Sequence, residues 1–208
     1  MVNPKQTLHF NDGKGHEKHI PFDEFSFHPV LKDIENFFWW WMLSINALSS
    51  LDVQQKLKND NTFSGILDKY NKSINLNINF KENGKEYVTK SNHQKQFVLI
   101  GKAIAILTFD FISSSKYQNS INHTKEFQFL RHLRNGAAHY NTFNLKNENG
   151  SWKIRKNEII EWKNKKIDRS LQGKEIFPTF FNLLEMFFLA YDLSNKLLMI
   201  DSNKKTND

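Results

Sequence analysis

Three runs of apolar residues limit most strongly what this chain can fold into. They cover residues 37–43, 97–112 and 177–200. A helix that spans a membrane needs about 20 consecutive apolar residues with few or no charges. The first run is too short, the second contains Lys102 and Asp110, and the third contains two carboxylates. We therefore expect buried helices of a soluble bundle and no membrane-spanning segment.

Helical spacing of apolar residues and helix-starting residues predict four long helices and one short helix. They cover residues 30–58, 62–70, 93–114, 124–139 and 178–200. Pro29 and Pro178 stand at the expected starts of the first and the last helix, where proline is well tolerated.

Alternating apolar and polar residues with turn sequences between them predict β-hairpins. They lie at 8–20, 74–89 and 142–155, and a further strand at 159–162 is left open. No strand–helix–strand alternation occurs, which argues against a parallel sheet. The predicted fold class is mainly α, a helical bundle with two small β-hairpin insertions at 74–89 and 142–155.

The length of 208 residues fits one core better than two. We expect a single domain over 1–208, with an N-terminal arm at 1–28 and a polar tail at 201–208. The 19 phenylalanines predict a core built from large rings. The absence of cysteine excludes disulfides and thiolate catalysis. Because the N-terminus also lacks the apolar segment of a signal peptide, the expected location is the cytoplasm.

The chain is basic, with a formal net charge of +7. This balance indicates a polyanionic partner, first nucleic acid and second a membrane surface. Low-GC coding bias also enriches lysine and asparagine, and this chain is rich in both, so the charge favours nucleic acid without deciding for it.

The helix predicted at 124–139 has one apolar and one polar side. Arg131, Asn135 and His139 are spaced by four residues and form one polar ridge. Arg134 lies instead at the edge of the apolar side. Since burying its charge alone costs several kcal/mol, this arginine must pair with an anion or extend to solvent.

These residue types suit metal-independent RNA cleavage. Histidine transfers protons near neutral pH, a guanidinium binds two phosphate oxygens, and an amide orients either group. On an ideal helix, however, Arg134 and His139 point about 140° apart. The pair therefore predicts half a site that a second copy completes, unless the helix distorts or ends near Gly136. The small residues 136–138 leave room for a backbone or a second subunit to approach.

The segment Arg134-Asn135-Gly136-Ala137-Ala138-His139 resembles the R-x4–6-H signature of the HEPN superfamily, and the flanking residues 129–141 are also similar to it. HEPN proteins are helical bundles, usually dimers, that pair two motifs in a basic cleft and cut RNA without a metal. Many act in toxin–antitoxin, abortive-infection or CRISPR-linked defence.

The resemblance implies a HEPN-like bundle and a homodimeric endoribonuclease toxin or defence effector that needs no cofactor. It implies catalytic roles for Arg134 and His139 and a supporting role for Asn135. Regulation is expected from a separate antitoxin or other partner protein. One departure concerns control by adenylylation, which uses a tyrosine two residues after the histidine. Here Tyr140 follows directly and Asn141 takes the second position, so that mode of control is not expected.

Four cationic residues are candidates for RNA binding. Arg131 and His132 lie on the motif helix, and Lys153 and Arg155 lie in the second hairpin. Further basic residues are concentrated around the second hairpin: Lys156, Lys163, Lys165, Lys166 and Arg169. A solvated face and an RNA-guiding rim both fit this pattern.

Two other clusters favour structural roles. His16 and His19 in the arm lack the supporting carboxylate or cysteine spacing of a metal site, so no metal site is predicted. The aromatic run 39–41 fits core or dimer packing better than base stacking.

Two rival interpretations stay open. The chain could be a non-catalytic HEPN-like module that binds RNA or a protein. It could also be a structural helical dimer in which His139 only caps a helix, since cations favour helix C-termini.

Overall fold

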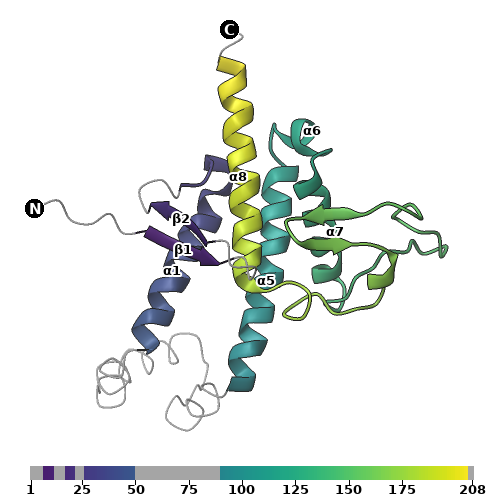
Figure 1. Ribbon diagram of the computed structural model, residues 1–208, viewed down its shortest axis with the longest axis horizontal. Coiled ribbons are helices and arrows are strands. Elements are labelled where there is room, and N and C mark those ends of the chain that lie inside the picture. The colour runs from purple at the N-terminus through teal and green to yellow at the C-terminus, as the bar shows by residue number, and fades with distance from the viewer. Residues whose placement is uncertain (1–6, 12–16, 22–25, 50–89, 206–208) are drawn as a thin grey trace, which may run out of the picture.

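The computed structural model describes residues 7–11, 17–21, 26–49 and 90–205, and its helices dominate the fold (Figure 1). The α-helices are α1 (Lys32–Ser49), α5 (Lys90–Ser113), α6 (Gln118–Ile121), α7 (Lys125–Ala138) and α8 (Leu183–Lys205). Two 3-10 turns, η1 (Pro29–Leu31) and η2 (Arg169–Leu171), accompany them. The prediction of a mainly α protein is confirmed, whereas the helix and hairpin predicted within 62–89 lie outside the described residues.

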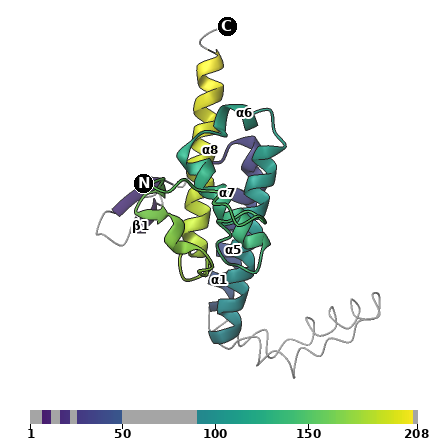
Figure 2. The ribbon, with the colours of Figure 1, turned by 90° about the vertical axis from the view of Figure 1, so that its right-hand side faces the viewer.

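Helix α5 contacts α1, α7 and α8, so one of its sides joins the other long helices of the described bundle. The two perpendicular views in Figures 1 and 2 show α5 and α8 side by side, with α8 extending beyond the other helices at its C-terminal end. The core of the described bundle is rich in aromatic rings, as the composition predicted. Its fully buried phenylalanines are Phe127, Phe129, Phe143, Phe177, Phe181 and Phe187.

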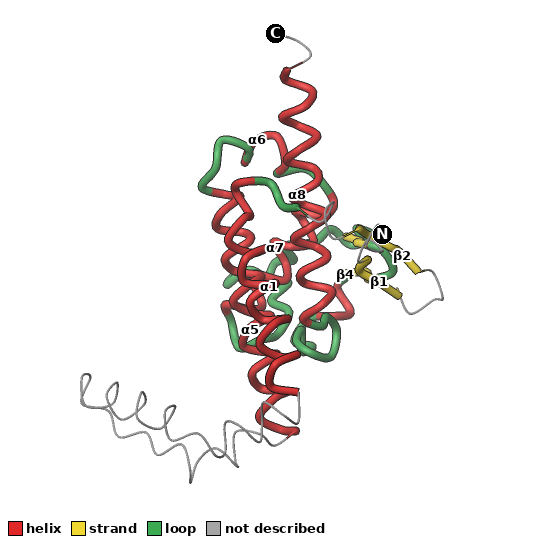
Figure 3. Tube along the Cα trace, turned by 90° about the vertical axis from the view of Figure 1, so that its left-hand side faces the viewer, coloured by secondary structure: helices red, strands yellow, loops and turns green. Residues whose placement is uncertain are grey.

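The N-terminal hairpin is present as β1 (Thr7–Asn11) paired antiparallel with β2 (Glu17–Pro21), at the side of the bundle (Figure 3). The end of the predicted arm is not peripheral, because Phe27 and His28 are buried. The backbone N–H of His28 donates to Ser194 Oγ at 2.5 Å, and its Nε2 lies 3.1 Å from Asp201 Oδ2. These bonds attach the arm to α8.

The last helix begins and ends later than predicted. Pro178 follows a cis peptide bond and does not open it. Instead, Asn182 caps α8: its Oδ1 accepts from Glu185 N at 2.8 Å, and Glu185 Oε2 accepts from Asn182 N at 2.8 Å. This reciprocal pair is a capping box. The helix then continues to Lys205, so residues 201–205 are not the polar tail that we predicted.

The second hairpin differs from the prediction at 142–155. Regular pairing occurs between β3 (Ile160–Trp162) and β4 (Lys165–Ile167), whereas 142–155 holds one isolated bridge between Lys146 and Trp152. The reason is that Phe143 exchanges backbone hydrogen bonds with Gly173 and Lys174, both of 2.9 Å. The segment 142–146 thus divides its backbone groups between two neighbours and forms no regular strand.

Helix α5 is less covered than a core helix. Within the described residues, its Lys95–Ser113 stretch is the one part of a helix long and apolar enough to cross a membrane, and 28% of that stretch is buried. The prediction of a buried helix at 97–112 therefore holds for one side of α5, whereas Leu99, Ala103 and Leu107 are exposed on the other.

Candidate active site

The predicted motif lies on α7 and on the turn that follows it. Thr124 begins the helix as its N-cap, accepting from Phe127 N at 3.4 Å. The helix ends at Ala138, and His139 is its C-cap with an extended backbone at φ −123° and ψ 92°. The polar ridge of Arg131 and Asn135 therefore does not continue to His139. Because the helix ends within the motif, the angle between Arg134 and His139 that was expected for an ideal helix does not apply.

The turn after His139 is tightly defined. Tyr140 and Asn141 both adopt left-handed backbone conformations, with φ of 55° and 61°. The buried Asn141 side chain donates to Phe177 O at 2.6 Å and accepts from Phe177 N at 3.2 Å. Asparagine tolerates this conformation better than most residues. The chain therefore reverses sharply and returns across the end of α7.

Gly136 makes this return possible. A Cβ atom at Gly136 would collide with Ile176 Cδ1 and would lie 2.5 Å from Thr142 O. The small residues were predicted to admit a close backbone or a second subunit. The structure shows a backbone of the same chain in that place.

Arg134 is paired, as its position at the apolar edge predicted. Its Nη2 lies 3.6 Å from Asp110 Oδ1 on α5, and its guanidinium lies 5.4 Å from the centre of the Phe109 ring. The Arg134 side chain is 32% exposed and that of Asp110 is 52% exposed, so solvent screens the ion pair. Arg134 Nε is buried and has no hydrogen-bond partner among the described residues. A part of the guanidinium remains accessible to an anion.

His139 is exposed and lines a cleft of about 660 Å³. The other lining residues are Asn144, residues 146–149 and Lys153. The cleft combines an imidazole with two lysines, Lys146 and Lys153, so it can hold an anion beside a proton-transfer group. Arg134 and Asn135 do not line it. The structure thus brings Lys153 to His139 but does not bring Arg134 to it.

His132 was predicted to bind RNA, and the structure corrects this. The residue is 6% exposed, and burial together with the nearby charge of Arg131 lowers its pKa from 6.5 to about 4. Its Nδ1 has no hydrogen-bond partner among the described residues. Strand β3 packs against α7, and the charges of Lys153 and Glu158 act on His132, so the chain after the motif lies near this residue. A buried, neutral imidazole does not bind phosphate as a cation.

The other predicted RNA-binding residues differ in their availability. Arg131 donates to Gln128 Oε1 at 3.3 Å and to Asn122 Oδ1, so its guanidinium is engaged by neighbouring side chains. Lys153 donates to Asn144 O at 3.2 Å and is exposed, and the Arg155 side chain is exposed as well.

Several residues of the predicted basic rim are occupied by structural contacts. Lys163 pairs with Asp192 at 3.3 Å, and Lys165 pairs with Glu185 at 3.2 Å. Arg169 donates twice to Ile154 O, at 2.9 and 2.8 Å. These residues stabilise the β3–β4 region, so the rim available to a ligand is smaller than the sequence suggested.

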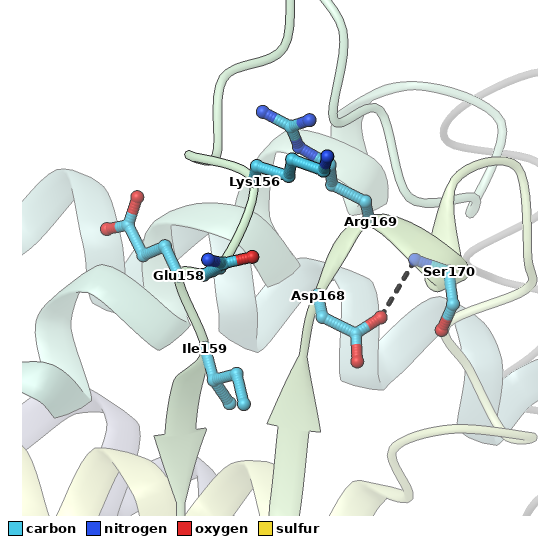
Figure 4. A pocket seen from close by; sticks show the side chains of 7 residues that line it. Lys156, Glu158, Ile159, Asp168, Arg169 and Ser170 are labelled. Carbon is cyan, nitrogen blue, oxygen red and sulfur yellow. Dashed lines mark hydrogen bonds between the residues drawn. The ribbon is translucent and has the colours of Figure 1, made fainter.

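A second hollow, of about 390 Å³, lies between residues 156–159 and 168–170. Figure 4 shows Lys156 and Arg169 there, with their cationic groups pointing away from the ends of β3 and β4. Asp168 accepts from Ser170 N at 2.8 Å, and hydrogen bonding from Ser170 holds the pKa of Asp168 below its ordinary value. No residue of the motif lines this hollow, so it is not the candidate active site.

Sequence reasoning missed three site residues. Asp110 was noted only as a charge inside an apolar run, although an acid there is the natural partner for an arginine on the next helix. Asn144 and Lys146 alternate with the buried Phe143 and Leu145, and this alternation was the signal that both face outward. No group of three metal-binding side chains occurs among the residues that the structure describes.

Comparisons with protein-family models, curated proteins and solved structures found no match to this chain. The assignment of function therefore depends on the residues and their arrangement.

Proposed function

We propose that this chain is a metal-independent endoribonuclease of the HEPN type. The observation that carries the proposal is the end of α7, where His139 leaves the helix and faces a cleft that also holds Lys146 and Lys153. The resemblance of the segment 134–139 to the HEPN signature supports the same activity. In this proposal His139 transfers protons and Arg134 binds the phosphate. Asn135 orients one of these two side chains.

The reaction would follow from the position of an imidazole beside an RNA phosphate. A neutral His139 accepts the proton of a ribose 2′-hydroxyl, and the 2′-oxygen attacks the adjacent phosphorus. The bond from phosphorus to the 5′-oxygen breaks, and that oxygen takes a proton from the His139 imidazolium, which returns the imidazole to its neutral form. The products are a 2′,3′-cyclic phosphate and a 5′-hydroxyl. Cationic groups stabilise the negative charge that develops on the phosphate oxygens.

A homodimer would combine Arg134 with the cleft of another copy. Leu99, Ala103 and Leu107 form an exposed apolar stripe on α5 that ends at Asp110, the partner of Arg134. Residues spaced by three or four positions share one helix face. A second copy packed on this stripe would place its own surface beside Arg134. The substitution Leu107→Glu is expected to convert a dimer to a monomer in sedimentation or light scattering.

The biological role proposed from the resemblance is that of a toxin or antiviral defence effector. It acts in the cytoplasm, and an antitoxin or other regulatory protein controls it.

Cleavage of RNA by the purified protein in EDTA tests the activity. We expect cleavage that leaves 2′,3′-cyclic phosphate ends and that is lost in Arg134→Ala and in His139→Ala. His123→Ala, at an exposed histidine before α7, is the matched control and retains activity. Unchanged cleavage by both motif variants would refute the assignment.

A non-catalytic module that binds RNA or a protein is the second candidate. It is favoured by the pairing of Arg134 with Asp110 and Phe109 away from the His139 cleft. It predicts salt-sensitive RNA binding without any product, together with an unchanged RNA affinity in Arg134→Ala.

A further inference from the structure

The chain directly after the motif builds one wall of the His139 cleft. Phe143 and Leu145 are buried in the core, and the alternation of a strand-like segment turns Asn144 and Lys146 outward. Lys153 N donates to Leu145 O at 2.9 Å and fixes the opposite wall. The cleft is thus attached to the core at both walls. Its volume of about 660 Å³ lies within the range of roughly 300–1,000 Å³ that small-ligand sites occupy.

The two lysines of the cleft keep their positive charge available. The Lys146 ammonium lies 4.8 Å from the centre of the Trp152 ring, and the Lys153 ammonium donates to Asn144 O at 3.2 Å. Neither lysine forms a salt bridge within the described part of the chain. Glu148 is the one acidic residue among the lining residues. The cleft therefore carries a net positive charge even when His139 is neutral, which suits a phosphate.

Three asparagines add directed hydrogen-bonding groups. Asn149 Oδ1 accepts from Ser151 N at 3.0 Å and from Ser151 Oγ at 2.6 Å, so its NH₂ group is left to donate. Asn147 Nδ2 donates to Ser151 Oγ at 2.9 Å, so its carbonyl oxygen is left to accept. Asn144 is half-buried at the cleft. Such a set of donors and acceptors can pair with the edge of a nucleobase.

Stacking is not available to the base from Trp152. The Lys146 ammonium lies 4.8 Å and the Arg169 guanidinium lies 4.9 Å from the centre of the Trp152 ring. This ring therefore already contacts two cationic groups of the protein. The asparagines therefore recognise the base through hydrogen bonds to a free base edge. In a duplex those edges are engaged in base pairing, which excludes double-stranded RNA from this mode of binding.

We infer that this cleft is a nucleotide subsite for unpaired RNA beside the scissile phosphate. Lys146 and Lys153 bind the phosphate of the nucleotide in this subsite, and the asparagines bind the edge of its base. The inference rests on the proposed function for the identity of the ligand, and it assigns Asn144 and Asn149 as residues that determine which nucleotide is cut.

The test separates binding from cleavage. The inactive His139→Ala protein serves as the background for measuring binding of a labelled single-stranded RNA oligonucleotide by fluorescence anisotropy at several salt concentrations. The variant Lys146→Gln/Lys153→Gln is expected to bind at least tenfold more weakly, and its salt dependence should fall by about 0.7 for each phosphate that is no longer neutralised. Lys156→Gln/Lys166→Gln, with two exposed lysines outside the cleft, is the matched control. Lys146→Arg/Lys153→Arg should retain binding, and circular dichroism checks the fold of each variant.

Cleavage mapping supplies the second readout. In the active protein, Asn144→Ala and Asn149→Ala should change which nucleotides flank the cuts. If the wild-type protein cuts RNA but the lysine and asparagine variants behave like it, the subsite is refuted and the proposed function stands. If the wild-type protein does not cut RNA but the cleft lysines are required to bind single strands, the nuclease assignment fails and the cleft stands as a binding site for unpaired RNA. Equal affinity for single-stranded and duplex RNA also refutes the subsite.

Discussion

The buried histidine of α7 should make the stability of this protein depend on pH. His132 is 6% exposed, and its pKa in the native protein is lowered from 6.5 to about 4. Between these two values the unfolded chain binds a proton that the native state excludes. The free energy of unfolding therefore rises with pH through this window and falls as the pH drops from 6.5 toward 4.

The magnitude follows from the two pKa values. Fully crossing the window costs about 3 kcal/mol, because one pKa unit corresponds to about 1.4 kcal/mol. Between pH 7 and pH 5 the same relation gives a loss of about 2 kcal/mol. His132→Leu removes the titrating group. Whatever that substitution does to packing is the same at both pH values, so it cancels in the comparison.

Urea denaturation at pH 7, 6 and 5 measures the effect. Relative to the wild-type protein, His132→Leu should gain about 2 kcal/mol of unfolding free energy on going from pH 7 to pH 5. His123→Gln, at an exposed position, should show no such gain. If the wild-type protein and His132→Leu differ in unfolding free energy by the same amount at pH 7 and pH 5, His132 is accessible to protons in the native state. It would then again be a candidate for binding RNA.

Three further substitutions test the site and its attachment. Gly136→Ala should lower the free energy of unfolding by about 1–3 kcal/mol, because its Cβ would meet Thr142 O at 2.5 Å; an unchanged urea midpoint would contradict that crossing. Asp201→Asn should lower the thermal midpoint at pH 7, since Tyr117 and then His28 hold the pKa of Asp201 below 3.8; the difference should shrink in acid, and a constant difference would argue against this cause. A double-mutant cycle on Asp110 and Arg134 should give a coupling of at most about 1 kcal/mol, and a larger value would show a pair less screened than its exposure implies.

Helices were predictable where apolar spacing and terminal residues agreed. Residues 124–139 fixed α7 almost to its ends, because Thr124 is a standard cap and the apolar side is continuous. The start of α8 was misplaced because Pro178 is a common first helical residue, although Asn182 and Glu185 carry a capping-box pattern. Its end was misplaced because residues 201–205 are polar, and the partners of Asp201 come from distant parts of the sequence.

The site was predictable only as far as α7 itself determines it. The position of Arg134 on the helix required a partner, and Asp110 with Phe109 provides it. His132 was assigned to the polar face because the helix alone cannot show what covers it. Lys153 and Glu158, whose charges act on His132, come more than twenty residues later in the sequence. The same long-range folding brings Lys153 to His139 in a way that spacing cannot reveal.

The return of the chain over Gly136 also restricts how two copies could share a site. Thr142 and Ile176 already fill the space that the small side of α7 leaves open, so a second copy cannot approach the helix at Gly136. The exposed stripe of Leu99 and Leu107 on α5 is the apolar surface that leads to Arg134 through Asp110. The dimer proposed here, which joins Arg134 of one copy to His139 of the other, is therefore built on α5. Consequently Leu107→Glu should abolish cleavage together with dimerisation, and it should leave RNA binding by the cleft intact.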